Sequence, residues 1–588
     1  YLDGLFNGVK YQGSFTSDLI YHAKKNELLI LDRGNFRLVR YSLTQKKVTA
    51  SIPTGRQPFG LALSPDKKTV LVANVGMYAY PLVEGTTKEN LNSQDGYFLG
   101  GRSLTGVVIA GSMLLTNIST EHLIGMNGSS YKNGFIIIAW EVTSALALII
   151  AAIYFVPKYL KMGLTTIPQY LEQRFDKTTR KLVAFFLMIS FVVTLLPIVL
   201  YTGAINLESI FNVSEVLGVS QQQGITITVI GIGLLGSLYA IVGGLKAVAV
   251  SDTINGYGLL IGGLAVPCIA LASIGEGNIF TGLKTVYNHA PEKFNVVGAS
   301  DSILPFGVLF TGLIINQLYF WSMNQTIIQR ALGAKSLVEA QKGLLYTGVL
   351  KILVPLIIIL PGVIGFYYYG DSLYENQDMI YPELIKKVFP VGLIGLFAAI
   401  VMGAVLSTFN SVLNSAATIF SIDIYKGIFE KDCADRKLVG VGKLTSAVLA
   451  FFAILVAPFV ANAPDGLYQL LQQLNGIFFI PIASIMLAGF LTKTISATAA
   501  KAALIIGLTF YILTTFIFPV DIHFVHVWGI EFVLNVVVMF GVSYWYPQSQ
   551  KEWEAQPALL DLKTWKYTTH FSISLCVITV LIYVLLGS

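Results

Sequence analysis

The sequence has little charge and little cysteine for its length. Only 12% of its 588 residues are charged, about half the share of a soluble globular domain, whereas 54% are apolar and the mean hydropathy is +0.68. Three cysteines, Cys268, Cys433 and Cys576, give no disulfide framework. These deficits argue against a string of soluble domains. The net charge is +6, and the surplus Lys and Arg residues lie in short loops between apolar runs. We therefore expect no nucleic-acid partner.

Long apolar runs dominate the chain after residue 102. Runs of about 20 residues can cross the hydrocarbon of a bilayer as helices. They predict an all-α membrane protein with thirteen membrane helices, at about 103–128, 134–156, 180–206, 224–242, 251–274, 305–331, 342–369, 391–425, 437–461, 466–491, 497–519, 523–546 and 568–587.

The connections between these helices predict their orientation. Alternate connections on one side hold 20 Lys and Arg residues, and those on the other side hold five. Because cytoplasmic loops are enriched in Lys and Arg, the first set is expected in the cytoplasm. We therefore expect a multi-pass protein of the cell (inner or plasma) membrane, as a monomer or loose oligomer.

The first 85 residues differ in composition and predict short strands. Apolar stretches at 28–31, 38–41, 60–63 and 70–74 are separated by turns, and the stretch from Pro53 to Asn74 resembles a blade of the YVTN or lactonase propeller family. So few blades cannot close a ring. We expect a β-rich fragment over 1–85, a cytoplasmic linker over 86–102, and no role of the fragment in transport. The sequence starts at Tyr1 without Met, and we expect a fragment or a processed product.

Three charged residues fall where hydrocarbon is expected. A charge there costs at least about 2.5 kcal/mol, so it needs a partner or a function. Glu141 and Lys351 interrupt long apolar runs, and Asp252 opens a membrane helix. Glu141 and Lys351 form either a structural ion pair or part of a hydrated cavity that binds a polyhydroxyl solute. Asp252 is either a helix N-cap or an ion ligand.

Two polar clusters lie at mid-depth in predicted membrane helices. The first runs from Thr116 to His122, and the second contains Ser407 and Thr408. Unwound backbone is tolerated at this depth where it faces protein or water, and its carbonyls and neighbouring hydroxyls can bind a cation. Such clusters also occur as packing contacts between helices.

Several ordered motifs resemble those of the sodium/glucose cotransporters, within the solute:sodium symporter family, with the Vibrio-type sodium/galactose symporter closest in pattern. The motifs are Asp95-Gly-Tyr-Phe-Leu-Gly-Gly-Arg102, Asn117-Ile-Ser-Thr-Glu-His122, Asn324-Gln-Thr-Ile-Ile-Gln-Arg330, Asn414-Ser-Ala-Ala-Thr-Ile-Phe420 and Asp423-Ile-Tyr-Lys426. The resemblance implies a leucine-transporter-type fold, with two inverted five-helix repeats over 103–491 and additional helices over 492–588. The family has a further helix before the first motif, and here the β-rich fragment stands in its place.

The resemblance also implies site residues. The family's sugar-contact pattern falls on His122, Glu141, Ser144, Gln317, Lys351 and Gln472, with Phe320 as inner gate and Tyr468 as outer gate. Its sodium site falls on the carbonyls of Leu115, Ile118 and Ala404 and the hydroxyls of Ser407 and Thr408, and Ser251 with Asp252 match a possible second ion site.

These residues predict sodium-coupled symport of a neutral hexose, glucose- or galactose-like, by alternating access. Two alternatives stay open: another polyol or a sugar acid, such as inositol or sialic acid, as the solute, and a membrane sugar sensor without flux. An enzyme is not expected, since the core holds no nucleophile–base pair, metal cluster or phosphate loop.

Overall fold

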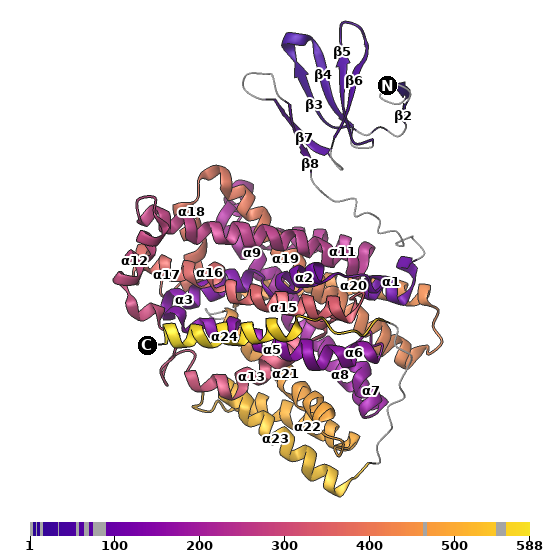
Figure 1. Cartoon of the computed structure of the whole chain (residues 1–588), viewed down its shortest axis with the longest axis vertical. Helices are drawn as coiled ribbons and strands as arrows, with labels where there is room; N and C mark the ends of the chain where they lie inside the picture. Colours follow the sequence, from indigo (N-terminus) through magenta and orange to yellow (C-terminus); the bar gives the residue numbers. More distant parts are fainter. Residues whose placement is uncertain are drawn as a thin grey trace. The chain divides into compact units, whose positions relative to one another are not determined.

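The chain folds into two units, Tyr1–Glu89 and Asn90–Ser588, which are described separately (Figure 1). The computed structural model describes residues 4–6, 9–11, 14, 16–32, 35–54, 58–63, 70–74, 90–462, 467–548 and 560–587.

The first unit consists of antiparallel strands. Strands β3 (Thr16–His22), β4 (Glu27–Asp32), β5 (Arg37–Ser42) and β6 (Lys47–Pro53) form one meander in chain order. Two hairpins accompany it, β1 (Gly4–Phe6) with β2 (Val9–Tyr11) and β7 (Pro58–Leu63) with β8 (Val70–Asn74). Leu29, Leu31 and Leu38 form the small core. A four-stranded meander is the size of one propeller blade, and the propeller resemblance itself stays a prediction. The predicted linker begins outside the described residues.

The second unit is helical and apolar. Among the described residues, ten helices are long and apolar enough to cross a membrane: Glu121–Lys161, Lys177–Glu208, Ala240–Ile274, Leu337–Tyr369, Phe397–Phe429, Asp435–Val460, Tyr468–Leu491, Ala497–Ile517, Phe524–Trp545 and Thr568–Leu586. Gly106–Asn117 is a shorter apolar helix. Large apolar side chains such as Leu238, Ile261 and Leu585 are mostly exposed, as expected for a surface that faces lipid.

The helices of the first half are α1 (Gln94–Phe98), α2 (Gly106–Asn117), α3 (Asn127–Asn133), α4 (Ala139–Val142), α5 (Ser144–Ile150), α6 (Val156–Lys161), α7 (Ile167–Arg174), α8 (Lys177–Ile189), α9 (Leu196–Phe211), α10 (Val213–Leu217), α11 (Gln221–Ile274) and α12 (Ile279–His289). Those of the second half are α13 (Gly312–Ser322), α14 (Gln325–Leu332), α15 (Leu337–Leu353), α16 (Pro355–Ile358), α17 (Leu360–Tyr369), α18 (Ile380–Val388), α19 (Val391–Ile419), α20 (Asp435–Val456), α21 (Leu467–Leu491), α22 (Ala497–Ile512), α23 (Phe524–Trp545) and α24 (Thr568–Leu586).

Helix α2 lies at the centre of this unit, where it packs against α11, α15 and α19 (Figure 1). Helix α11 is bent at Gly244, whose φ of 60° belongs to the left-handed region that favours glycine. A Cβ at Gly244 would lie 2.6 Å from the carbonyl oxygen of Tyr97. The bend separates the two membrane segments predicted at 224–242 and 251–274.

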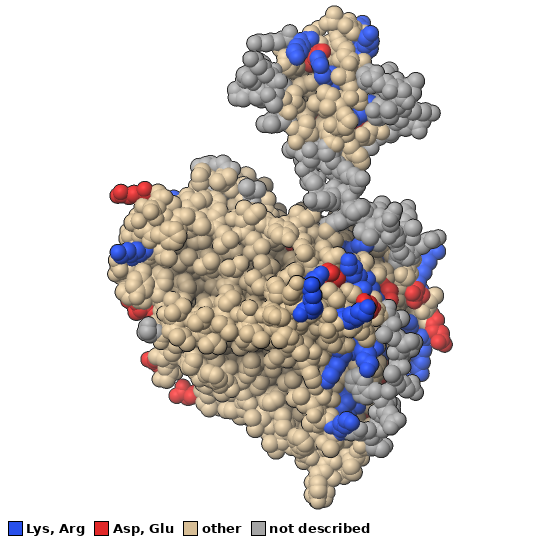
Figure 2. All heavy atoms as spheres, in the orientation of Figure 1, with Lys and Arg blue, Asp and Glu red and all other residues tan. Residues whose placement is uncertain are grey.

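Asp252 lies well inside the second part of α11, so the interpretation of this residue as a helix N-cap is wrong. Figure 2 shows that most of the visible Lys and Arg side chains of the helical unit gather at one end. That distribution agrees with the loop asymmetry read from the sequence.

Candidate solute and sodium site

One cavity inside the helical unit collects polar side chains from helices far apart in the chain. Its lining includes five of the six predicted sugar contacts and both predicted gates. It is formed by Thr116, Asn117, Glu121, His122, Trp140, Glu141, Leu195, Asn316, Gln317, Phe320, Trp321, Asn324, Thr326, Lys351, Thr408, Val412, Tyr468, Leu471, Gln472, Asn475 and Phe479.

A break in the first membrane helix opens one wall of this cavity. Helix α2 ends at Asn117, and Ile118 is extended with φ of −85° and ψ of 107°. The chain then resumes as the π-helical turn η4 (Glu121–Met126). The carbonyls before the break therefore lack the full set of helical donors. The polar run from Thr116 to His122 had predicted this break, whereas the second polar cluster lies in the unbroken helix α19.

A buried ion pair crosses the cavity. Lys351 of α15 pairs with Glu141 of α4, and both side chains are at most 2% exposed. Lys351 Nζ also donates to Asn117 Oδ1 at 2.6 Å, so α15 is joined to the end of α2. The pair satisfies both charges and at the same time presents polar atoms to the cavity, so the two interpretations of the sequence are compatible.

Amides form a second polar group in the lining. Gln317 Nε2 donates to the Trp140 carbonyl at 2.7 Å and to Thr143 Oγ1 at 3.1 Å, and Gln317 Oε1 accepts from Trp321 Nε1 at 3.1 Å. Gln317 is thus held by the protein itself. Asn316 and Asn475 each have a buried Oδ1 atom without a hydrogen bond from any described residue. These two acceptors remain available to a ligand.

Aromatic rings bound the cavity. Tyr468 is buried, and its ring lies 5.3 Å from that of His122 and 5.9 Å from that of Trp140, both edge to face. The half-buried Phe320 ring lies 5.2 Å from that of Trp321. Apolar ring faces of this kind suit the C–H faces of a sugar.

Ser144 lies beside the cavity and is not among the side chains that line it. Its hydroxyl donates to the Glu141 carbonyl within the same helical stretch, and the residue is fully buried. Ser144 is therefore outside the cavity lining. The other five predicted sugar contacts line the cavity together: His122, Glu141, Gln317, Lys351 and Gln472.

Two of the predicted sodium ligands, Leu115 and Thr408, contact each other where α19 passes the end of α2. Thr408 Oγ1 donates to the carbonyls of Leu115 and Thr116 at 3.2 and 3.3 Å. Ser407 Oγ is buried and has no hydrogen bond of ordinary geometry with a described residue. Carbonyl and hydroxyl oxygens are hard ligands of the kind that suit an alkali ion, and the Ser407 hydroxyl also interacts with the Asp252 carboxylate. The carbonyls of Ile118 and Ala404 belong to the same two segments.

Asp252 belongs to a buried network next to these ligands. Ser112 Oγ donates to Asp252 Oδ2 at 2.7 Å, and Arg330 Nε donates to that hydroxyl at 3.2 Å. Arg330 lies 3.8 Å from the Asp252 carboxylate and also donates to Ser411, whose hydroxyl is 2.9 Å from that of Thr116. Ser251, the neighbour of Asp252, is only half-buried.

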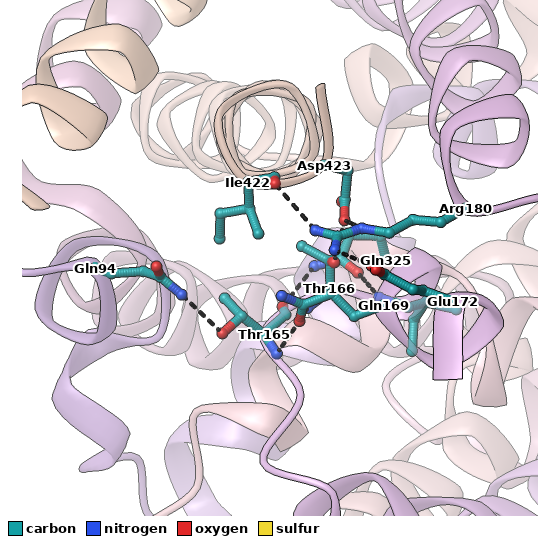
Figure 3. A network of polar contacts seen from close by, with 10 residues as sticks. Gln94, Thr165, Thr166, Gln169, Glu172, Arg180, Gln325, Ile422 and Asp423 are labelled. Carbon is teal, nitrogen blue, oxygen red and sulfur yellow. Dashed lines mark hydrogen bonds and ion pairs between the residues drawn. The ribbon is translucent and has the colours of Figure 1, made fainter. Parts of the chain in front are cut away.

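A separate polar network joins α7, α8 and the segment that follows α19. Figure 3 shows Arg180 of α8 reaching the Asp423 carboxylate, 2.7 Å away, with Glu172 on its other side. Thr166 Oγ1 donates to Asp423 at 2.9 Å, and Arg180 also donates to the Ile422 carbonyl at 3.0 Å. These contacts fix the end of the segment that continues α19 against α7 and α8.

Sequence reasoning missed several lining residues. Asn117 and Glu121 lie within the polar run that it had named, and Trp140 and Asn316 adjoin Glu141 and Gln317, whereas Asn475 is reached only through helix packing. A period of three or four residues from Gln472 to Asn475 places both on one helix face and could have indicated the latter.

Much of the helical unit matches known proteins. Residues 97–507 match the Sodium:solute symporter family. The chain is 46% identical over 479 residues to the uncharacterized symporter YidK of Escherichia coli (strain K12), covering 82% of this chain and 84% of that protein. It is 32% identical over 496 residues to the sodium/glucose cotransporter of Vibrio parahaemolyticus, covering 80% and 88%.

More distant relatives extend the comparison. Over 465 residues the chain is 29% identical to the sodium/myo-inositol cotransporter of Bos taurus, covering 72% of this chain and 62% of that protein. The solved structure of a Na+-coupled sialic acid symporter, 21% identical, matches with a TM-score of 0.66 over 80% of this chain and 96% of that one, and shows the same fold. This chain therefore belongs to the sodium:solute symporter family, as a multi-pass secondary transporter of the cell membrane that uses sodium as its coupling ion.

Proposed function

We propose that this symporter carries a neutral hexose, glucose- or galactose-like, together with sodium. One observation carries the proposal: Glu141, Lys351 and Gln472, from helices far apart in the chain, line a single buried cavity. Sugar hydroxyls both donate and accept hydrogen bonds. In this assignment the Glu141 carboxylate accepts, the Lys351 ammonium donates, and the Gln472 amide does both.

The charges of the lining support a neutral solute. Two carboxylates, Glu121 and Glu141, face the cavity with one ammonium, that of Lys351. A sugar acid such as sialic acid would add another negative charge to this group, at a cost that low polarity inside the protein increases. Inositol has the same hydroxyl chemistry as a hexose, and the bovine relative is named for it. Competition by glucose, galactose, myo-inositol and sialic acid against a labelled hexose separates these solutes.

The sodium ion is assigned to the crossing of α2 and α19. The carbonyls of Leu115, Ile118 and Ala404 and the hydroxyls of Ser407 and Thr408 would hold it, and the ion would supply the positive charge that joins the two segments. A second ion would use Ser251 and Asp252. Since Thr408 is an assigned ion ligand and also lines the solute cavity, ion binding fixes the wall against which the sugar rests. Binding must then be reciprocal: sodium raises sugar affinity by the same factor as sugar raises sodium affinity.

Uptake of radiolabelled hexoses into proteoliposomes tests the solute site. We expect Gln472→Ala to abolish sodium-driven uptake. Gln473→Ala is the matched control, because the neighbouring side chain does not line the cavity. Equal uptake by the two variants would contradict the proposed site.

A second experiment tests the ion site. We expect Thr408→Ala to lose the dependence of uptake on sodium and Thr408→Ser, which keeps the hydroxyl, to retain most of it. Equilibrium sugar binding should be stronger in sodium buffer than in choline buffer. Unchanged binding would contradict the coupling, and sugar binding without any uptake would identify a sensor.

A further inference from the structure

A buried carboxyl lies in the C-terminal helices, outside the lining of the solute cavity. Glu531 is in α23, inside a segment apolar enough to cross the membrane, and its side chain is 0% exposed. It belongs neither to the solute cavity nor to the sodium ligands. A carboxyl at such a position needs either a partner or a function.

Glu531 has no charged partner in the part of the chain that the structure describes. Neither carboxyl oxygen has a hydrogen bond of ordinary geometry with a described residue, and no ion pair with a described residue involves it. The groups around it are uncharged: Asn535 one turn further along α23, and the Tyr511 hydroxyl of α22. Asn535 in turn donates to Ser484 Oγ of α21 at 3.3 Å. Burying an ionised carboxylate without a charged partner costs on the order of several kcal/mol of free energy. The neutral acid is therefore the stable form of this side chain.

Close helix packing leaves little room for a larger ligand. A Cβ at Gly476 of α21 would lie 2.1 Å from Trp528 Nε1 and 2.8 Å from the Tyr511 hydroxyl. A Cβ at Gly507 of α22 would lie 2.4 Å from Asn535 Oδ1. A hydrated cation requires several oxygen ligands and space, whereas a proton requires neither.

We propose that Glu531 is a proton-binding site, held as a neutral carboxylic acid between α21, α22 and α23 at neutral pH. Loss of the proton places an unpaired charge at this three-helix contact. The contact is joined to the cavity at two points. The Trp528 ring lies 6.2 Å from that of Trp140, which lines the cavity, and Tyr511 donates to the carbonyl of Gln473 at 3.1 Å, next to Gln472.

Infrared difference spectroscopy of the purified full chain tests the site without any transport assay. The wild-type protein is expected to show the carbonyl stretch of a protonated carboxylic acid at neutral pH, which disappears in Glu531→Gln. Glu531→Met serves as a second neutral variant of similar length. The exposed Glu375→Gln is the matched control and should leave the band in place. A band that is absent from the wild type, or that survives both Glu531 substitutions, overturns the proposal.

The pH profile tests the consequence of losing the proton. Because deprotonation would place an unpaired charge at this contact, thermal stability and sodium-driven uptake of the wild type should fall as the pH is raised above neutral. In Glu531→Gln the decline should be absent, because the amide stays neutral. Superimposable wild-type and variant profiles would overturn the proposal.

Sodium titration at neutral pH distinguishes a proton from a sodium ion at this position. The Hill coefficient and half-saturating sodium concentration of Glu531→Gln should match those of the wild type. A lower Hill coefficient would assign Glu531 to sodium instead and overturn the proton assignment. The infrared measurement does not depend on the transported solute. Its result therefore tests the proton site independently of the hexose proposal.

Discussion

The Lys351–Glu141 pair shows how one contact can serve both stability and binding. Both groups are buried, and the Asn117 amide oxygen accepts a further hydrogen bond from Lys351. Burying two charges gains little net stability over an apolar pair, but removing one partner leaves the other charge uncompensated. The pair is therefore expected to be sensitive to single substitutions.

We expect Lys351→Met to lower the free energy of unfolding by about 3–5 kcal/mol, because Glu141 is then left unpaired. The double variant Lys351→Met with Glu141→Gln should recover part of this loss, although uptake stays absent. Thermal unfolding of the purified proteins measures both effects. A double variant no more stable than Lys351→Met would contradict the pairing argument.

Asp176 gives a residue-scale prediction of acid sensitivity outside the membrane segments. Burial raises the pKa of Asp176, but the bonds from Lys501 at 2.7 Å and from the Thr179 amide and hydroxyl at 2.7 and 2.8 Å outweigh it and hold the pKa below its usual value. A carboxyl whose folded-state pKa is depressed stabilises the fold above its unfolded pKa, and this contribution is lost as the pH falls through the lower, folded value.

The loss should therefore occur below about pH 4. Asp176→Asn should be less stable than the wild type at neutral pH and should show a smaller decline in acid. The exposed Asp432→Asn is the control, with an unchanged profile. Melting temperatures measured across the acid range check this, and identical acid declines for Asp176→Asn and wild type would contradict it.

At the scale of elements, helix contacts in this unit depend on glycine. Gly476 lets α21 approach α23 so closely that the Trp528 ring occupies the space of a side chain. Because packed interiors tolerate little added volume, a single methyl group there must displace one helix.

We expect Gly476→Ala to cost about 1–3 kcal/mol of stability through overpacking and to reduce hexose uptake, since Gln472 lies one turn earlier on the same helix. Gly440→Ala in α20 is the control, because a Cβ there meets no atom within 4 Å and alanine favours the helix. Thermal unfolding and proteoliposome uptake measure the two effects. A neutral Gly476→Ala would show that the α21–α23 contact is looser than described.

At the scale of the whole molecule, the helical unit contains the complete candidate site. Every residue assigned to the solute, sodium or proton lies in Asn90–Ser588, and Tyr1–Glu89 forms its own unit with a separate small core. Deletion of residues 1–89 is therefore expected to leave sodium-driven uptake per folded protein unchanged. Uptake by purified, monodisperse truncated protein checks this. Loss of uptake in such a sample would show that the strand unit takes part in transport.

The membrane character followed from local sequence features. The apolar runs and the uneven distribution of Lys and Arg predicted the helices and their orientation, because burial in lipid acts on each segment alone. The polar run from Thr116 to His122 likewise predicted the break in the first helix, since backbone there must find partners other than helical ones. The residues of the site were named mainly through the family resemblance, and their roles stay predictions.

Other properties depend on which helices pack together, and no single segment contains that information. Proximity of α15 to α4 allows Lys351 to satisfy Glu141, and the crossing of α19 with the end of α2 places Thr408 against the Leu115 carbonyl. The same packing leaves Ser144 outside the cavity lining and places Asn475 within it. The sequence by itself determined which segments are helices that face lipid, and which polar and charged side chains those helices carry. Only the tertiary structure decided which of those groups face one cavity and which, like Glu531, have no charged partner among the described residues, because distances between helices arise from contacts among residues hundreds of positions apart.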